Sequence, residues 1–487
     1  MQEMEKHMLR VSNVVTATGG ELIFPDSWDN DRQNELSNTY IQGTVMDNRL
    51  VEKDYLFVPF IGEKVDAHKY IPAAYEAGAA ICFSMRKLDE EVPYILVEDS
   101  GQALKDLATY YRSTLDIPII GIVGSVGKTS TKEMVAAVLS EKYNVLKTEG
   151  NFNNEIGLPL TIMRIRPEHQ VAVVEMGISD FDEMNRLSTI ARPNYLVMTN
   201  IGPCHLEFLH DLDGVLNAKT EAFEHLSNHP KLVLNGDDEK LRSIHHGIPS
   251  GTYHAVPEDA DIFFFGREDK ALLENDGMPA AAYADNIDDR GLEGIDCDLD
   301  LFGENMHIHI SLPGQHNINN AMAAAIIGES LGLTSNQIQE GIAKGNTIAG
   351  RSNIIRLGDI LVIDDCYNAG PVSMKASLGV LASASGRKIA VLGDMGELGE
   401  DAPALHSSVG QAVADNEIDL LYTVGSLSEE IHKTATANGV KCIHFDTIEA
   451  LLPELLQEIK AGDTILIKAS HFMNFTQIVK ALEDKLQ

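Results

Sequence analysis

The residues with the clearest chemical meaning form a short glycine-containing stretch that ends in a lysine and two hydroxyl side chains. In order they are Gly124, Ser125, Val126, Gly127, Lys128, Thr129 and Ser130. Glycines permit positive φ and leave room for a phosphate against the backbone, a lysine neutralises β- and γ-phosphates, and a hydroxyl group binds Mg²⁺. The strict pattern G-x-x-x-x-G-K-[ST] is not met, because Ile122 occupies its first position. The stretch still predicts a phosphate-binding turn; the alternative is a glycine turn that precedes a lysine by chance.

Three other polar residues are considered for a functional role. Two of them lie where a binding site is expected, and the third has no such indication. Glu175 and His205 follow two apolar runs of the sequence, and ligands gather at the carboxyl ends of parallel strands. Glu175 is therefore a candidate ligand for Mg²⁺ or water, and His205 a candidate neighbour of a metal or phosphate. The alternatives are an acid on a surface turn and an ordinary loop histidine. Lys219, taken alone, is typical of a solvated charge on a helix.

The last third of the chain has two similar loops. Asp364 and Asp365 end an apolar run and are followed by Asn368, which suits a ribose or metal contact. The stretch 393–399, GDMGELG, and His406 form a second loop after a predicted strand. A structural role and a functional role are equally compatible with that loop.

A parallel sheet is needed to bring these residues together. The β-branched run 119–123 predicts a strand covered on both faces. The helix that opens at Lys128 offers free N–H groups and a positive dipole end to an anion. Its apolar stripe consists of Met134, Val135, Val138 and Leu139. Further apolar runs alternate with helical stretches and predict a doubly wound sheet, at 171–176, 195–199 and 231–234.

We expect an α/β protein of three domains, since a domain takes ~150 residues. The expected boundaries are 1–112, 113–345 and 346–487. The predicted strands of the first domain are 55–60, 79–83 and 94–97, and its predicted helices are 70–78 and 102–115. In the central domain, a β-rich excursion is expected between 257 and 312, followed by a helix at 317–331. The predicted strands of the last domain are 360–363, 388–392, 420–424 and 464–467.

Composition narrows the class of protein further. The 487 residues carry a formal charge of −35, which argues against general affinity for nucleic acid or an anionic membrane. The five cysteines are scattered without metal-ligand spacing, as expected in a reducing compartment. The sequence has neither a signal-peptide pattern nor an apolar run of ~20 residues. We expect a soluble cytoplasmic protein.

Short motifs spread over all three predicted domains resemble the ATP-dependent Mur ligase family. They are GSVGKTSTKEM (124–134), EGNFNNEIGLPLT (149–161), VVEMG (173–177), TNIGPCHLEFL (199–209), NAKTEAFEHL (217–226), LPGQHNINNAMAAA (312–325), AGRSN (349–353), DDCYNAGPVSM (364–374) and LGDMGELG (392–399). The resemblance covers nearly the whole chain. It implies an N-terminal domain for a UDP-sugar, a central domain for ATP, and a C-terminal Rossmann-like domain for the incoming amino component.

The resemblance also implies a bacterial reaction in peptidoglycan precursor synthesis. ATP phosphorylates the C-terminal carboxylate of UDP-MurNAc-tripeptide, and the amine of D-Ala-D-Ala attacks the acyl phosphate. The motifs YNA-x-P, GDM-x-ELG and NxNNEIGxPL favour this dipeptide-adding activity within the family. A carboxylate is a poor electrophile, so a phosphoryl leaving group must be installed under Mg²⁺ and lysine charge neutralisation. ATP and Mg²⁺ are the implied cofactors, and we expect a monomer.

Site residues carry over from the resemblance by matching position. Lys128 binds phosphate, Thr129 and Glu175 bind Mg²⁺, and His205 lies near a second metal. Lys219 falls on a lysine that is carbamylated and becomes an anionic Mg²⁺ ligand, a role that rests on the resemblance alone. The nucleotide-side residues are Asn317 and Asn320 on the adenine side, and Arg351 and Asp365 from the C-terminal domain. The substrate-side residues are Asp47, Asn48, Arg49, Asn153, Asn154 and Asn368.

The sequence departs from the family pattern at three places. Asn48 stands where many relatives have serine near the uridine, and Gly370 where YNANP is commoner. Residues 468–471, KASH, replace a frequent KGSR beside the dipeptide. One rival interpretation is a family ligase that adds a single amino acid, or glutamate to folate. The other is a regulatory nucleotide-binding protein, which would not need Glu175 or the acids near Asp365.

Overall fold

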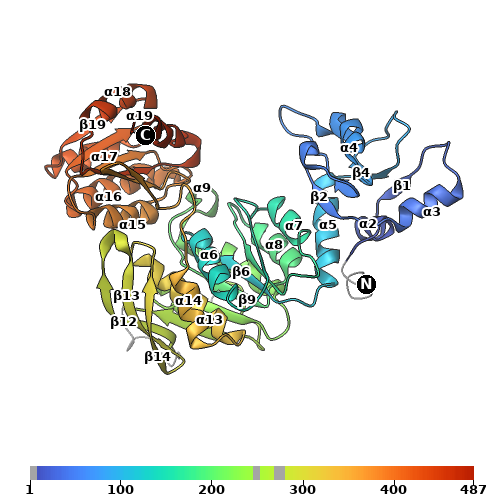
Figure 1. The fold of residues 1–487 in the computed structure, drawn as a ribbon, viewed down its shortest axis with the longest axis horizontal. Coiled ribbons are helices and arrows are strands. Elements are labelled where there is room, and N and C mark those ends of the chain that lie inside the picture. Colours follow the sequence, from blue (N-terminus) through green and yellow to red (C-terminus); the bar gives the residue numbers. More distant parts are fainter. Residues whose placement is uncertain (1–7, 245–252, 268–279, 487) are drawn as a thin grey trace.

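Three β-sheets follow one another along the chain in the computed structural model, which describes residues 8–244, 253–267 and 280–486. They contain five, nine and six strands. The N-terminal and C-terminal sheets lie on opposite sides of the central one (Figure 1). Helices accompany the strands in every sheet, so the predicted α/β class is confirmed. Within the described ranges, no helix has both the length and the apolar character that a membrane crossing requires.

The N-terminal unit is a small, mainly parallel sheet with the order β1-β5-β4-β3-β2. The predicted strands are confirmed as β3 (Tyr55–Phe57), β4 (Ile81–Ser84) and β5 (Tyr94–Leu96). Strand β3 is shorter than the predicted 55–60; Pro59, just beyond it, has no N–H to donate to a ladder. Two short strands were not predicted, β1 (Glu21–Ile23) and β2 (Gly43–Val45). The helices are α2 (Val11–Thr18), α3 (Asn30–Asn38), α4 (Ile71–Ala77) and α5 (Ser100–Ser113).

The central sheet is built around β6 (Ile119–Val123), which is fully buried between two parallel neighbours. Those neighbours are β8 (Val171–Glu175) and β9 (Tyr195–Met198). Ile119 and Val123 belong to one hydrophobic core, whereas Ile120 and Ile122 belong to another. Both faces of the strand are therefore covered, as the β-branched run predicted. The remaining parallel strands are β7 (Val145–Lys147), β10 (Lys231–Asn235) and β11 (Asp261–Gly266).

Helices cover both faces of this sheet. On one face lie α6 (Lys128–Leu139), α13 (His316–Ser330) and α14 (Ser335–Ala343), which pack on one another. On the other face, α5 reaches over from the N-terminal unit to pack on α7 (Gly157–Ile162) and α8 (Glu183–Ala191). Two short helices follow β9 before β10: α9 (Leu206–Leu209) and α10 (Leu212–Thr220).

The predicted β-rich excursion is an antiparallel extension of the central sheet. It consists of β12 (Ala280–Asp289), β13 (Ile295–Leu301) and β14 (Glu304–Ile310). Strand β12 pairs with β11 in parallel, and β13 and β14 continue outward as antiparallel neighbours. The sheet therefore runs without a break from β7 to β14.

The C-terminal unit is an open sheet with the order β15-β16-β20-β17-β18-β19, antiparallel only at β15. Its predicted strands are confirmed as β16 (Ile360–Asp364), β17 (Lys388–Gly393), β18 (Leu420–Val424) and β20 (Thr464–Lys468). Strands β15 (Asn353–Leu357) and β19 (Cys442–Phe445) complete it. The helices are α15 (Pro371–Ala382), α16 (Ala402–Asp415), α17 (Glu429–Ala437), α18 (Ile448–Glu458) and α19 (Thr476–Leu486).

Candidate active site

The glycine turn between β6 and α6 has the shape that the sequence predicted. Gly124 has φ +153° and Gly127 has φ +87°, and a Cβ on Gly124 would lie 1.9 Å from Thr199 Oγ1. No other residue fits at Gly124, and Gly127 needs its left-handed backbone. Lys128 Nζ donates to Gly124 O at 2.8 Å, so the lysine lies along the turn. The turn thus presents a lysine and the N-terminus of α6 to one place.

The loop after β9 holds this turn from outside. Asn200 Oδ1 accepts from Val126 N at 2.9 Å, and Asn200 O accepts from Ser125 N at 3.1 Å. Thr199 Oγ1 donates to Val126 O at 2.6 Å. Gly202 N donates to Ser125 Oγ at 2.9 Å. Asn200 was not among the predicted site residues; its signal in the sequence is its place at the end of the strand next to β6.

Glu175 ends β8 and is only 2% exposed, so the interpretation as a surface acid is wrong. Its carboxylate accepts from Thr129 Oγ1 at 2.9 Å and from Asn153 Nδ2 at 2.8 Å. Over the described residues, no cationic side chain forms a salt bridge with it. A buried carboxylate is costly without a positive charge beside it. The Thr129–Glu175 pair therefore fits a bound cation.

A second layer of hydrogen bonds fixes Glu175. Glu175 N donates to Thr148 Oγ1 at 3.0 Å, and the buried Lys132 Nζ donates to Thr148 O at 2.7 Å. Neither Lys132 nor Thr148 was predicted as a site residue. Lys132 holds the carbonyl of Thr148, the residue after β7, and the Thr148 hydroxyl holds the N–H of Glu175; sequence spacing does not reveal these contacts.

Lys219 lies inside the protein, and its interpretation as a solvated charge is wrong. It lies in the last turn of α10 and is 2% exposed. Burial, with a smaller effect from the charge of Lys128, lowers the pKa of its amine to about 8. Among the described residues, its Nζ forms no hydrogen bond or salt bridge. A buried amine with a lowered pKa is partly neutral near pH 7, and the neutral amine is the nucleophilic form.

His205 caps α9 and faces the C-terminal unit. Its Nδ1 lies 2.5 Å from Glu397 Oε2, a close contact between an imidazole nitrogen and a carboxylate oxygen. The contact with His205 lowers the pKa of the Glu397 carboxyl. Within the described part of the chain, no group of three His, Cys, Asp or Glu residues has the arrangement of a metal site. Of the four predicted metal residues, Thr129 and Glu175 contact each other, whereas His205 contacts Glu397, which was not predicted, and Lys219 has no recognised contact with the other three within the described residues.

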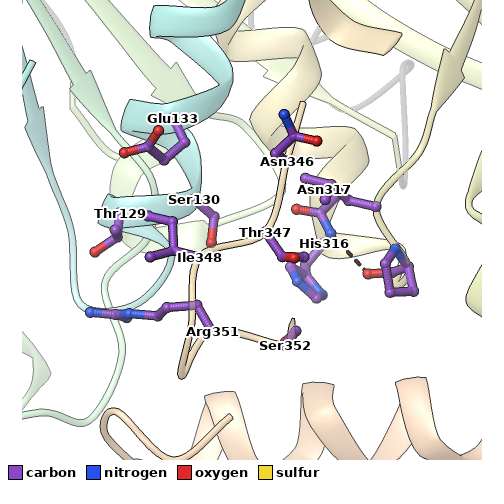
Figure 2. A pocket seen from close by; sticks show the side chains of 12 residues that line it. Thr129, Ser130, Glu133, His316, Asn317, Asn346, Thr347, Ile348, Arg351 and Ser352 are labelled. Carbon is purple, nitrogen blue, oxygen red and sulfur yellow. Dashed lines mark hydrogen bonds between the residues drawn. The ribbon is translucent and has the colours of Figure 1, made fainter. Parts of the chain in front are cut away.

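A cavity opens between α6, α13 and the segment that leads into the C-terminal unit (Figure 2). Its lining includes Thr129, Ser130, Glu133, His316, Asn317, Asn346, Thr347, Ile348, Arg351 and Ser352. Asn317 donates to Pro313 O at 2.9 Å, and Asn320 lies behind it, donating to Asn317 Oδ1 at 2.9 Å. Arg351 stacks on Tyr367, with 4.1 Å between its Cζ and the ring centroid. The structure therefore brings Thr129, Ser130, Asn317 and Arg351 to one cavity beside the glycine turn.

Asp365 is not in that lining, although it was predicted to reach the nucleotide. Its carboxylate accepts from Lys468 Nζ at 2.7 Å, Ser377 Oγ at 2.5 Å and Ser352 N at 3.0 Å. Asp365 acts on the cavity through Ser352, which lies next to Arg351. Asn368 is exposed, and its carbonyl accepts from Lys468 Nζ at 3.0 Å.

A second cavity, of about 430 Å³, lies between the N-terminal and central units. Its lining includes Phe60, Met85, Asp99, Ser100, Lys105, Asn154, Glu155 and Glu183. Of the predicted substrate residues it contains Asn154, whereas Asn153 contacts Glu175. Asp47 and Arg49 lie elsewhere and form an exposed ion pair that lowers the pKa of Asp47 to about 2. Asn48 begins the 3-10 helix between them.

Known proteins resemble this chain over nearly its whole length. The family described as "Mur ligase middle domain" matches residues 122–328, and "Mur ligase, glutamate ligase domain" matches residues 350–471. The UDP-N-acetylmuramoyl-tripeptide–D-alanyl-D-alanine ligase of Bacillus subtilis is 33% identical, covering 97% of this chain and 98% of its own. The enzyme of the same name from Escherichia coli is 34% identical, over 91% of this chain and 94% of its own.

Solved structures agree with the sequence comparison. MurF from Acinetobacter baumannii has a TM-score of 0.85 and 27% identity, covering 98% of this chain and 99% of its own. MurF ligase from Thermotoga maritima, solved in complex with ADP, has a TM-score of 0.77 and 28% identity, over 91% and 97%. The fold is that of an α/β ligase of three domains. The chain belongs to the Mur ligase family, as its motifs predicted.

Proposed function

We propose that this chain is an ATP-dependent, ADP-forming ligase that joins D-Ala-D-Ala to UDP-MurNAc-tripeptide in peptidoglycan precursor synthesis. The observation that carries the proposal is the buried Glu175–Thr129 pair beside the glycine turn. It stands in a chain that matches full-length ligases of that name. The pair supplies the hydroxyl and carboxylate that hold Mg²⁺ in phosphoryl transfer, and the match to full-length ligases favours a ligase over a nucleotide switch.

In the first step, the γ-phosphoryl group of ATP is transferred to the C-terminal carboxylate of the tripeptide, which gives an acyl phosphate and releases ADP. Lys128 and the N–H groups at the start of α6 neutralise the phosphates. The adenine side of the nucleotide lies in the cavity lined by Asn317, and Asn320 supports Asn317 from behind. Arg351 contacts the phosphates from the C-terminal side, and Asp365 positions the Arg351 segment through Ser352.

In the second step, the amine of D-Ala-D-Ala attacks the acyl carbon. A tetrahedral intermediate forms, the amine loses a proton, and the C–O bond to phosphate breaks, leaving an amide and inorganic phosphate. Both steps require anions to be held close together and away from water. The approach of the C-terminal unit to the glycine turn provides that exclusion.

Mg²⁺ fits the donor set around Glu175. Thr129 and Glu175 would hold one ion, and His205 and Lys219 would contribute to a second. Bound there, Mg²⁺ neutralises charge on the transferring phosphoryl group. Lys219 contributes an oxygen ligand only as a carbamate, and its lowered pKa of about 8 supplies the neutral amine that reacts with CO₂.

The three units take the roles expected from the family resemblance. We assign the UDP-sugar to the N-terminal unit (1–112), ATP to the central unit (113–345) and the dipeptide to the C-terminal unit (346–487). Asp47, Asn48 and Arg49 serve the uridine, Asn153 and Asn154 the peptide, and Asn368 the dipeptide. We place the protein in the bacterial cytoplasm as a monomer, without nucleic-acid or membrane partners.

Phosphate release separates this proposal from its rivals. Purified protein with ATP, Mg²⁺ and UDP-MurNAc-tripeptide should release phosphate in a steady state only when D-Ala-D-Ala is added. If a single amino acid replaces the dipeptide, the family remains and the dipeptide assignment is wrong. If nucleotide binds and no amine supports release, the chain is a nucleotide switch and the proposal fails.

A further inference from the structure

The loop 393–399 of the C-terminal unit is held rigidly on its own sheet. Ser428 N donates to Asp394 Oδ1 at 2.7 Å, and Gly396 N donates to Ser470 Oγ at 2.9 Å. Met395 N donates to Nε2 of the buried His406 at 2.9 Å. The loop is thus fixed by three separate elements of its own unit and does not depend on the central unit for its shape.

Glu397 projects from this fixed loop toward the central unit. Its φ is +60°, and φ of its partner His205 is +52°. Positive φ is uncommon outside glycine and persists where the surrounding structure fixes it. The two residues meet with 2.5 Å between His205 Nδ1 and Glu397 Oε2.

Neighbouring contacts show that this meeting is part of a continuous interface. A methyl group on Gly399 would lie 3.6 Å from Glu207 Cα, and one on Gly202 would lie 3.5 Å from a Val372 side-chain carbon. Helix α9 touches the 3-10 helix Gly399–Asp401, and it reaches toward the C-terminal unit in Figure 1. The segment 202–209 therefore lies against the C-terminal unit at several points.

This segment and the residues just before it hold the glycine turn. Asn200 binds Ser125 and Val126, and Ser125 Oγ also contacts Cys204 Sγ at 3.2 Å. A displacement of His205 is transmitted over a few residues to the backbone that receives the phosphates. The path runs from Glu397 to His205 by direct contact, along the chain from His205 to Cys204, and from Cys204 Sγ to Ser125 Oγ by direct contact.

We propose that Glu397 is a positioning residue that couples the placement of the C-terminal unit to the shape of the phosphate-binding turn. It does so by fixing His205 when the two units meet. The inference rests on the proposed function, because it assigns Glu397 a role in that same site. Stability alone does not account for the contact, since an exposed ion pair contributes little and the Glu397 side chain is 54% exposed.

Two measurements on Glu397→Ala test the proposal, with Glu400→Ala, directly after the same loop, as the matched control. Glu400 is exposed, and its side chain forms no hydrogen bond or salt bridge with the described residues. The first measurement is amide hydrogen exchange in the substrate-free protein. Exchange over 199–209 should be about two- to fivefold faster in Glu397→Ala, as expected when one exposed ion pair is lost. Glu397→Gln keeps an acceptor oxygen and should restore most of the protection.

The second measurement is a double-mutant cycle on kcat with His205→Asn. Glu397→Ala should lower kcat by roughly 10- to 100-fold, because small misplacements of reacting groups have effects of this size. In the double variant, the fall in kcat caused by Glu397→Ala should not multiply with the fall caused by His205→Asn. Unchanged exchange over 199–209, or losses that multiply, would overturn the coupling. The exchange measurement needs no substrate, so it distinguishes failure of the coupling from failure of the ligase assignment.

Discussion

Among single residues, Glu175 gives the strongest support for the proposed cation site. Its carboxylate is buried, and within the described residues its hydrogen bonds come from the neutral side chains of Thr129 and Asn153. The position of Glu175 after an apolar run was enough to predict it. Lys132 and Thr148, which orient it, could not be predicted, because their contacts link helix α6, the residue after β7 and the end of β8, which are 16 and 27 residues apart in sequence. The burial of Lys219 was missed for a related reason: a lone lysine on a helix normally lies in solvent.

Lys128→Ala should leave the protein folded and lower kcat by about 100- to 1000-fold. Removing one preorganised charge from a transition-state site has an effect of this size, and Lys128 is only part-buried, so no core cavity results. The measurement is steady-state phosphate release, with circular dichroism as the folding check. Lys480→Ala, an exposed lysine on α19, is the control and should be neutral. Retained ligation in Lys128→Ala contradicts the phosphate-binding assignment.

Lys219→Ala should also abolish most activity, and a small carboxylate such as formate should restore part of it. The expected rescue follows from the carbamate role, because a free carboxylate can supply the missing oxygen ligand. Lys219→Arg should be inactive and should not be rescued, since its guanidinium does not form a carbamate and fills the space. The measurement is the ligation rate with increasing formate. Wild-type activity in Lys219→Ala would rule out a role for this lysine.

At the scale of elements, His406 on α16 holds the loop that carries Glu397. The imidazole is fully buried between Ala402 O and Met395 N, and burial lowers its pKa below the usual 6.5. The folded state therefore holds His406 neutral where the unfolded chain is protonated. Stability from this group is present above about pH 6.5 and is lost as the pH falls toward the lowered pKa, by at most about 1.4 kcal/mol per pH unit.

Urea unfolding of wild type and His406→Gln between pH 7.5 and pH 5 tests whether the stability contributed by His406 falls as the pH falls. The variant should be less stable at pH 7.5, and the difference between the two proteins should shrink as the pH falls. Other carboxylates and histidines titrate in both proteins and cancel in the comparison. A difference that is constant with pH would mean that His406 does not change its protonation on unfolding.

Long apolar runs were sufficient to predict the parallel strands of the central and C-terminal sheets. Strands such as β6 and β8 are buried on both faces, so their sequences are continuously apolar. Strands β1, β2 and β7 have three residues each and give no such signal. That β12 to β14 extend the central sheet was also not predictable, because it depends on the pairing of β11 with β12.

At the scale of the whole molecule, the site is completed only where two units meet. Arg351 belongs to the segment entering the C-terminal unit, yet it lines the cavity that contains Thr129 and Asn317. Asp365 and Lys468 form a buried pair behind that segment. The motif AGRSN indicated Arg351. The sequence could not predict that the Asp365 side chain pairs with Lys468 and does not line the cavity, because Lys468 lies 103 residues away.

Arg351→Ala should weaken ADP binding by roughly 10-fold, the usual effect of losing a hydrogen bond to a charged group. Isothermal titration calorimetry with ADP and Mg²⁺ measures this directly. Arg356→Ala, an exposed arginine on β15 outside the cavity lining, is the control and should bind ADP normally. Equal affinity of the Arg351 variant and wild type would place the nucleotide elsewhere.

In the proposed reaction, the carboxylate is activated by phosphorylation before the amine attacks. The decisive experiment uses UDP-MurNAc-tripeptide whose C-terminal carboxylate is labelled with ¹⁸O and measures how much of the label reaches phosphate. Ligation with ATP and D-Ala-D-Ala should transfer one labelled oxygen to each phosphate released, because the acyl C–O bond breaks when phosphate leaves. Mass spectrometry of phosphate and of the UDP-MurNAc-pentapeptide measures both products. Ligation that releases unlabelled phosphate would contradict the acyl-phosphate account.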